Sequence, residues 1–295
     1  MSGSQDWHSR IALLVLLLTT SDCTRVAFTA ANLPTHFASM TVVRDSAYGP
    51  EPSQKLDLYI PADSHDKPAD VVVFFYGGRW TYGAKEDYRF VGATFAKRGF
   101  LVAIPDYRKY PLVRFPVFVE DGAKALSWIK DHIADFHGDP ARIHVVGHSA
   151  GALIGALLTA DLQYLAREGK ERSSLIYDFT GLAGPYSFTP DEPDLEDMFG
   201  PPQNYPNMQA TSFIDGTQPP MLLLYGDKDR AVKLSNLLKL EQRITHRGGC
   251  VQSRIYRGVD HTDLLGALSW WKEDIPVIDD MIKFFDVCHV TTPRD

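Results

Sequence analysis

The sequence predicts an α/β fold in which helices cover both faces of a mostly parallel sheet. Two observations support this prediction. Strand-like apolar runs alternate with helical segments along the chain, which is typical of parallel sheets with right-handed crossovers. Most of the apolar runs are also nearly continuous, as expected for strands that are buried on both faces. The strands are expected at residues 56–62, 71–78, 100–108, 142–149, 221–227 and 253–258.

The elements between these strands follow from their residue spacing. The strand at 56–62, LDLYIPA, alternates apolar and polar residues more than the others, so we expect an outer strand there. In the segment 117–137, apolar residues such as Val119, Leu126 and Ile133 fall largely on one side of a helix. Helices are expected at residues 117–137, 150–167, 232–246 and 275–287.

Residues 189–220 form the most irregular stretch. They are rich in proline, asparagine and aspartate, and several carboxylates make them acidic. The strand pattern resumes at Met221, so we interpret this stretch as a cap or lid loop over the sheet and not as a linker between domains.

The overall composition excludes several classes of protein. The chain has 295 residues, of which 44% are apolar and 23% charged, and its formal net charge is −7. An acidic chain without a basic run is a poor nucleic-acid binder. None of the three cysteines lies in a C-x-x-C pair, so a zinc finger has no support.

The first 31 residues resemble an export segment. The apolar run IALLVLLLTT (11–20) follows Arg10, and ten helical residues span about 15 Å, half of a hydrocarbon core of about 30 Å. This length fits the apolar region of a signal peptide better than a membrane span. We therefore expect an exported protein, periplasmic or secreted, with its folded domain over residues 32–295.

The sequence allows two processing sites for this export segment. Thr29-Ala30-Ala31 fits a small-residue cleavage site. Alternatively, residues 20–23 resemble a bacterial lipoprotein box, in which Cys23 would carry a lipid and attach the protein to a membrane. In an oxidising compartment Cys250 and Cys288 could form a disulfide, but their spacing does not decide this.

The motif Gly147-His148-Ser149-Ala150-Gly151 predicts a nucleophilic serine. It follows an apolar strand and opens a helix of small apolar residues, which is the setting that a G-x-S-x-G nucleophile elbow requires. Side chains two residues either side of the serine would collide in so sharp a turn, and the glycines avoid that collision. We therefore predict that Ser149 stands exposed at the carboxyl edge of the sheet.

A serine hydroxyl needs a general base, and on this architecture the base follows the acid in the chain. The histidines after Ser149 are His246, His261 and His289. His246 lies at the basic end of a predicted helix, where it would interact with the helix dipole, and His289 lies in the tail. His261 directly follows the strand 253–258, so it is the best candidate base.

The acid that orients the base should follow the preceding strand. The segment MLLLYGDKDRAV (221–232) offers Asp227 and Asp229. We prefer Asp229 because an acid a few residues past the strand end can reach toward the base. Asp227 is the second candidate and Asp260 the third. A carboxylate that does not orient the base would be solvated or would cap a helix.

Acyl transfer also requires hydrogen-bond donors for an oxyanion. Tyr76-Gly77-Gly78-Arg79-Trp80 follows the strand VVVFF, and consecutive glycines let backbone N–H groups approach a ligand closely. We predict that the N–H groups of Gly77, Gly78 and Ala150 form the oxyanion hole.

With these motifs, the sequence resembles the α/β-hydrolase superfamily, and within it the carboxylesterases of the hormone-sensitive-lipase and feruloyl-esterase-like type, over roughly residues 38–287. YGGRW (76–80) is similar to the H-G-G-x-W oxyanion motif, with Tyr76 in place of histidine, and GDPARIHVVGHSAGA (138–152) is similar to the segment around the elbow. Asp106-Tyr107-Arg108 matches a D-Y-R run that we interpret as structural.

The resemblance implies that residues 32–295 form an α/β-hydrolase catalytic domain with no metal or organic cofactor. It implies Ser149 as nucleophile, His261 as base, Asp229 as acid, and Gly77, Gly78 and Ala150 as the oxyanion hole. Arg79 is expected at the mouth of the site, where it would attract an anionic substrate or pair with the acidic cap. Trp80, together with Trp270 and Trp271, is a candidate for lining an acyl or aryl pocket, although such aromatic residues are more typical of a core.

The function that follows is hydrolysis of carboxylic esters, with short-chain acyl or aryl esters as small-molecule substrates. The acidic cap disfavours a lipase, which needs a large apolar lid. Two alternatives stay open: an amide or formamide hydrolase or peptidase that uses the same residues, and a catalytically silent binding protein of the same fold.

Overall fold

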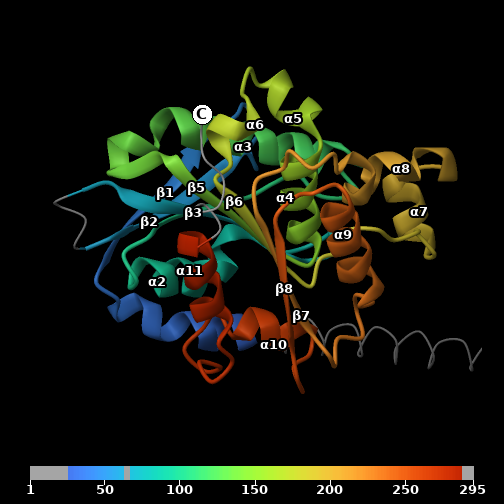
Figure 1. Cartoon of the computed structure of the whole chain (residues 1–295). Coiled ribbons are helices and arrows are strands. Elements are labelled where there is room, and N and C mark those ends of the chain that lie inside the picture. The colour runs from blue at the N-terminus through green and yellow to red at the C-terminus, as the bar shows by residue number, and fades with distance from the viewer. Residues whose placement is uncertain (1–25, 63–66, 288–295) are drawn as a thin grey trace, which may run out of the picture.

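The computed structural model describes residues 26–62 and 67–287. The apolar run 11–20, Cys23, Cys288 and His289 lie outside the described residues. The described chain forms one eight-stranded sheet with the strand order β1-β2-β4-β3-β5-β6-β7-β8 (Figure 1). The strands are β1 (Met40–Ala47), β2 (Lys55–Pro61), β3 (Ala69–Phe75), β4 (Leu101–Pro105), β5 (Gly138–His148), β6 (Asp178–Leu182), β7 (Met221–Gly226) and β8 (Val251–Tyr256).

The predicted mostly parallel sheet is confirmed. Strands β4, β3, β5, β6, β7 and β8 run parallel to one another along the sheet. At one end, β2 is antiparallel to β4 and β1 is antiparallel to β2. All six predicted strands are present. The expectation that residues 56–62 form an outer strand is wrong, because β1 covers the edge of β2, and the polar Asp57 on β2 is buried with an ion-pair partner, Lys85.

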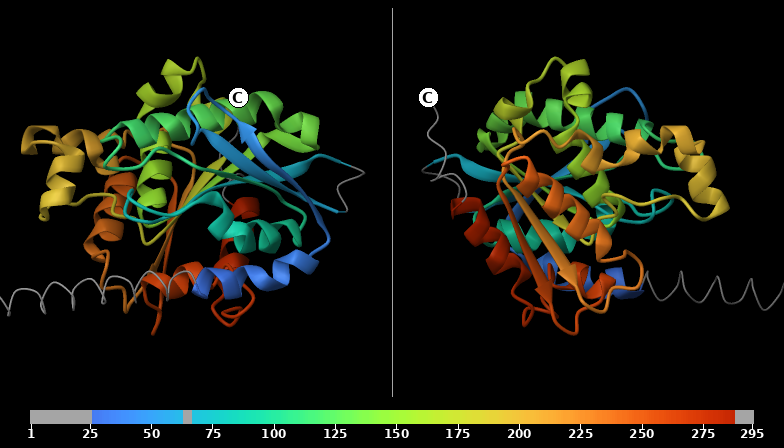
Figure 2. Two further views of the ribbon diagram at one scale, coloured as in Figure 1. Left: turned by 180° about the vertical axis from the view of Figure 1, so that it is seen from behind. Right: turned by 45° about the vertical axis from the view of Figure 1, so that its right-hand side comes forward.

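Helices cover both faces of the sheet, as predicted. Helices α3 and α4 lie on one face, and α2 and α11 lie on the other (Figures 1 and 2). The main helices are α2 (Arg89–Ala96), α3 (Val117–His132), α4 (Ala150–Ala160), α5 (Leu162–Arg167), α6 (Arg172–Leu175), α9 (Ser235–His246), α10 (His261–Gly266) and α11 (Val277–Val287). No helix in the described ranges is both long enough and apolar enough to cross a bilayer.

Two of the predicted helices end earlier than expected. The predicted helix 150–167 is divided at Asp161, whose carboxylate accepts a hydrogen bond from the Gln163 N–H and so begins α5. The predicted helix 117–137 ends as α3 at His132 and continues as the 3₁₀ helix η3 (Ile133–Phe136). His137, with a φ of 64°, then ends the helical conformation.

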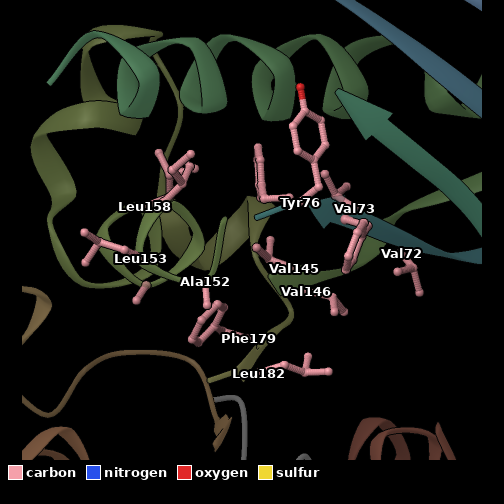
Figure 3. Close-up of a cluster of buried hydrophobic side chains, with 14 of the residues drawn as sticks. Val72, Val73, Tyr76, Val145, Val146, Ala152, Leu153, Leu158, Phe179 and Leu182 are labelled. Atoms are coloured by element: carbon pink, nitrogen blue, oxygen red, sulfur yellow. The ribbon is translucent and has the colours of Figure 1, made fainter. Parts of the chain in front are cut away.

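The core lies between the sheet and its helices. Val72 and Val73 of β3, Val145 and Val146 of β5, and Phe179 of β6 are fully buried (Figure 3). Side chains from these central strands meet those of α4, such as Leu153 and Leu158. Burial on both faces makes these strands nearly continuous apolar runs, and the rigid sheet they form supports the residues at its carboxyl edge.

The segment 189–220, which we expect to be a cap or lid loop, is not simply a loop. It contains short helices, α7 (Pro193–Phe199), η4 (Pro202–Asn204), α8 (Tyr205–Met208) and η5 (Ala210–Phe213), which extend to one side of the sheet (Figure 2). Proline occupies one of the first two positions of α7, η4 and α8, where its missing N–H is tolerated. The prolines that suggested irregular structure therefore begin helices.

Candidate active site

The predicted site residues lie around one cavity at the carboxyl edge of the parallel strands. Ser149, His261, Gly77, Gly78 and Ala150 all line this cavity of about 750 Å³. Ser149 follows β5, His261 follows β8, and the glycines follow β3. The parallel arrangement of these strands therefore brings residues from three distant parts of the chain to one edge.

Ser149 adopts the strained conformation that a nucleophile elbow requires. Its φ is 54° and its ψ is −120°, and its N–H donates to the Leu182 carbonyl at 2.9 Å. A Cβ on Gly147 would lie 2.5 Å from the Gly151 carbonyl oxygen, and one on Gly151 would lie 2.0 Å from the Phe75 carbonyl oxygen. The predicted collision on either side of the serine is therefore real, and only glycine fits both positions.

His261 and Asp229 form a partly buried hydrogen bond. His261 Nδ1 lies 2.7 Å from Asp229 Oδ2, and the Asp229 side chain is fully buried. Asp229 Oδ1 accepts the N–H groups of Ala231 and Val232 at 2.8 and 2.9 Å. Burial raises the pKa of Asp229, but the hydrogen bond from His261 and those from the backbone outweigh it and hold the pKa below its ordinary value. An ionised acceptor places the proton on Nδ1 and leaves Nε2 of His261 free to accept one.

The two competing carboxylates have other partners. Asp227 Oδ1 accepts the Gly258 N–H at 2.7 Å, which joins the loops after β7 and β8. Asp260 caps α10 by accepting the N–H groups of Thr262 and Asp263, each at 2.8 Å. The structure therefore brings Asp229, and not Asp227 or Asp260, into contact with the imidazole of His261.

Ser149 and His261 share the cavity without a hydrogen bond between them in the described part of the chain. Ser149 is half-buried, and the His261 side chain is 17% exposed. Such contacts often shorten only when substrate is bound. His246, the rejected alternative, is an exposed residue at the end of α9 and does not line the cavity.

The loop after β3 carries an unusual run of left-handed backbone conformations. The φ values are 117° at Gly78, 53° at Arg79 and 59° at Trp80, and left-handed residues other than glycine are strained. Ala150 is the first residue of α4, where an N–H has no intrahelical acceptor. Gly77, Gly78 and Ala150 line the same cavity as Ser149.

Tyr76 supports the loop that follows β3. Its ring stacks between Tyr88 and Tyr107, with centroids 4.8 and 4.9 Å away. Its hydroxyl donates a short hydrogen bond to the Asp106 carboxylate, while the Tyr107 hydroxyl donates to the Tyr76 carbonyl at 3.0 Å. Arg108, the third residue of the D-Y-R run, forms a hydrogen-bonded ion pair with Asp121. The run therefore has a structural role, and two of its residues support the oxyanion loop.

Arg79 and Trp80 connect the same loop to the cap. Arg79 forms ion pairs with Glu192 at 2.7 Å and with Asp194 at 3.0 Å, so of the two roles predicted for Arg79 the structure shows the contact with the acidic cap. Trp80 is only 3% exposed and packs against Phe199 of the cap and against Phe188, which directly precedes the cap. Both residues line the cavity, whereas Trp270 and Trp271 do not.

Sequence reasoning gave no role to His148, the residue before the nucleophile. Its Nε2 donates to the backbone carbonyl of His261 at 3.0 Å, and its ring is buried. The elbow motif contains this histidine, but the motif allows any residue at that position. Only the fold shows that it contacts the base.

The fold and this edge of the sheet define the class of protein as an α/β hydrolase with a serine, histidine and aspartate at one cavity. The solved structure of esterase B from Lactobacillus rhamnosis with a tributyrin phosphonate has the same fold. It matches with a TM-score of 0.78 at 18% identity, over 94% of this chain and 95% of that one.

The family model BD-FAE matches residues 56–244, and the chain belongs to that family. The resemblance to α/β-hydrolase carboxylesterases is thereby confirmed. The chain is 31% identical over 257 residues to a probable isoprenylcysteine alpha-carbonyl methylesterase of Arabidopsis thaliana, covering 78% of this chain and 52% of the relative. It is 27% identical over 215 residues to esterase LipC of Mycobacterium tuberculosis, covering 67% and 53%. The chain spans about half the length of these two curated relatives.

Proposed function

We propose that this protein is a serine carboxylesterase that hydrolyses small-molecule esters through an acyl-enzyme on Ser149. The observation that carries the proposal is the partly buried hydrogen bond from His261 Nδ1 to Asp229, at 2.7 Å, beside the cavity that Ser149 lines. A histidine oriented in this way has its Nε2 free to accept a proton. The esterase names of the relatives support the same reaction.

The reaction begins when Ser149 Oγ attacks the ester carbonyl carbon and its proton passes to His261 Nε2. The carbonyl oxygen becomes an oxyanion, which the N–H groups of Gly77, Gly78 and Ala150 stabilise. His261 then gives its proton to the leaving alkoxide, and the alcohol departs. Water attacks the acyl-enzyme with His261 again as base, which releases the carboxylic acid and restores the serine. Asp229 stabilises the imidazolium in both steps.

The cavity favours short acyl or aryl esters. Its lining includes aromatic and apolar side chains, among them Phe28, Tyr88, Phe188 and Leu265, together with charged residues such as Glu192, whose side chain is exposed. An apolar wall stabilises an acyl or aryl group by removing it from water, and the exposed charge disfavours the contact with a lipid surface that a lipase needs.

The test is an acyl-chain profile of residues 24–295. We expect turnover of p-nitrophenyl acetate and butyrate to exceed that of the palmitate ester, and the Ser149→Ala variant to retain only about 10³–10⁴-fold catalysis over water. Formyl-amides and dipeptides serve as competing substrates. Faster cleavage of these amides would favour an amide hydrolase, and no turnover of any substrate would favour a silent binding protein.

We also propose that the protein is exported and that processing leaves residues 26–31 on the mature chain. The ring of Phe28 packs 5.1 Å from that of Tyr88 and lines the cavity. Asn32 donates to the Asp87 carbonyl at 3.0 Å, and its side-chain oxygen accepts the Phe90 N–H at 2.9 Å. Cleavage after Ala31 would remove the Phe28 wall, whereas lipoprotein processing at Cys23 would keep it.

The mass of the mature N-terminus, measured after expression in a bacterium and separation of periplasm and membranes, tests this proposal. A lipidated Cys23 in the membrane fraction, or a soluble chain that starts before Phe28, supports it. A chain that starts at Asn32, or one that retains residues 1–22 in the cytoplasm, contradicts it.

A further inference from the structure

We infer that His148 is a positioning residue for the general base: by donating its Nε2–H to the main-chain carbonyl of His261, it holds the base against the nucleophile elbow. The inference rests on the proposed function, in which His261 accepts the proton of Ser149. It adds a direct connection between the segment that carries the nucleophile and the segment that carries the base.

The contact joins two elements that are otherwise separate in the chain. His148 is the last residue of β5 and precedes Ser149, and His261 is the first residue of α10. Nε2 of His148 lies 3.0 Å from the carbonyl oxygen of His261. The two rings are 4.8 Å apart at their centroids with planes inclined by 46°, so His148 touches both the main chain and the ring of the base.

The surroundings of His148 fix its tautomer. A carbonyl oxygen only accepts hydrogen bonds, so Nε2 carries the proton. Nδ1 is buried without a hydrogen-bond partner among the described residues. It faces the oxyanion loop, where a Cβ added to Gly77 would lie 3.0 Å from it. A proton on Nδ1 would place an unpaired charge in this enclosed space, which is unfavourable.

His148 therefore acts as a neutral donor. Burial lowers the pKa of His148 to about 3, and the charge of His261 acts in the same direction. The hydrogen bond to the His261 carbonyl and the charge of Asp229 raise this pKa but are outweighed. The His148 ring therefore stays uncharged at neutral pH. A charged lysine or arginine at this position would instead repel the imidazolium that forms on His261 during the reaction.

Two hydrogen bonds thus hold His261, one at its ring and one at its main chain. Asp229 binds Nδ1 of the ring, and His148 binds the main-chain carbonyl. These two contacts together restrict the rotation of the His261 ring. Because a displacement of about 1 Å in a reacting group can cost about 100-fold in rate, loss of the His148 contact should slow proton transfer without weakening substrate binding.

The test compares His148→Phe, which keeps a ring and removes the donor, with His148→Gln, whose amide N–H reaches the same carbonyl. We expect His148→Phe to lower kcat by about 10- to 100-fold and to change KM by less than about threefold. His148→Gln should recover most of the lost kcat. His132→Phe is the matched control, because the exposed His132 also has a ring nitrogen 2.8 Å from a backbone carbonyl, that of Trp128, and does not line the cavity.

A second readout does not depend on activity. The proton that His261 Nδ1 donates to Asp229 gives a downfield NMR signal that exchanges slowly with water while the ring is held. We expect this signal in the wild type and in His148→Gln, and its broadening in His148→Phe. An unchanged kcat and an unchanged signal in a folded His148→Phe would overturn the inference, as would equal losses of kcat in the Phe and Gln variants.

These measurements separate the two claims. A wild-type protein that hydrolyses no ester contradicts the proposed function, and the NMR comparison alone then decides the positioning role. If His148→Phe does not fold, His148→Gln provides the test. The inference requires this variant to keep at least about a tenth of the wild-type kcat, and a larger loss contradicts it.

Discussion

At the scale of single residues, Ser149 and His261 could be predicted because each is defined by its place after a strand. The choice between Asp227 and Asp229 could not be settled from sequence, since both carboxylates follow the same strand within three residues. The turn after β7 directs Asp229 toward His261 and Asp227 toward the Gly258 N–H. Side-chain direction in a tight turn depends on backbone torsions that the sequence does not display.

The different contacts of Asp227 and Asp229 predict different effects of their substitution on kcat. Asp229→Asn keeps the shape of the side chain but no longer fixes the His261 tautomer, so kcat should fall by about 10⁴-fold. Asp227→Asn should keep kcat within about threefold of the wild type, because among the described residues the Asp227 carboxylate accepts a hydrogen bond from the Gly258 N–H alone. Steady-state kinetics on p-nitrophenyl acetate check both. A larger loss in Asp227→Asn than in Asp229→Asn would show that the acid is assigned to the wrong residue.

Tyr76 gives a second prediction at this scale. Tyr76→Phe removes the hydroxyl that donates to the partly buried Asp106 carboxylate and keeps the stacked ring. The unfolding free energy should fall by about 2 kcal/mol, as expected when a charged acceptor loses a donor, and kcat should fall because the oxyanion loop is held less firmly. Urea unfolding and turnover measure the two effects. A Tyr76→Phe variant with wild-type stability and wild-type activity would show that the hydroxyl does not support the oxyanion loop.

At the scale of elements, apolar patterning revealed the strands that are buried on both faces but not the others. β1 alternates half-buried and exposed residues at the sheet edge, and β6 has only five residues. Neither gives a long apolar run. The cap helices escaped prediction because each has seven residues or fewer, and contacts with Trp80 and the core stabilise them more than helix propensity does.

The contact of the cap with the oxyanion loop can be tested. In the double variant Glu192→Gln and Asp194→Asn, Arg79 loses both ionic partners. These pairs are partly exposed, so the global unfolding free energy should change by less than about 1 kcal/mol. The amides of residues 189–200 should nevertheless exchange faster with solvent, because the cap opens locally. Arg167→Gln, which removes a partly exposed pair with Glu120 away from the cap, is the comparison. Unchanged exchange in the double variant would argue against a role of Arg79 in holding the cap.

At the scale of the whole molecule, a buried ionic cluster joins the central strands away from the cavity. His144 of β5 is fully buried, with Nδ1 2.7 Å from Asp178 of β6 and Nε2 3.6 Å from Asp70 of β3. Burial alone lowers the pKa of His144, but the charge of Asp178 and the contacts with both carboxylates outweigh it and raise the pKa to about 9. The sequence showed the histidine, but not that two other strands place carboxylates beside it.

This cluster predicts how stability depends on pH. The pKa of His144 is higher in the folded state than its unfolded value of about 6.5, so the folded protein holds the proton more tightly. The stabilisation, on the order of 3 kcal/mol, is fully present below about pH 6.5 and is lost as the pH rises toward 9. Urea unfolding across this interval should show the decline in the wild type and a flatter curve in His144→Gln. Parallel curves for the two proteins would contradict the raised pKa.

The central claim is that Ser149, activated by His261, is the nucleophile. Covalent labelling with a fluorophosphonate, followed by peptide mass mapping, tests it most directly. The account predicts one adduct per chain, on Ser149, with no labelling of Ser149→Ala and labelling of Asp229→Asn that is slower by orders of magnitude. An unlabelled wild-type protein, or an adduct on a different residue, would contradict it.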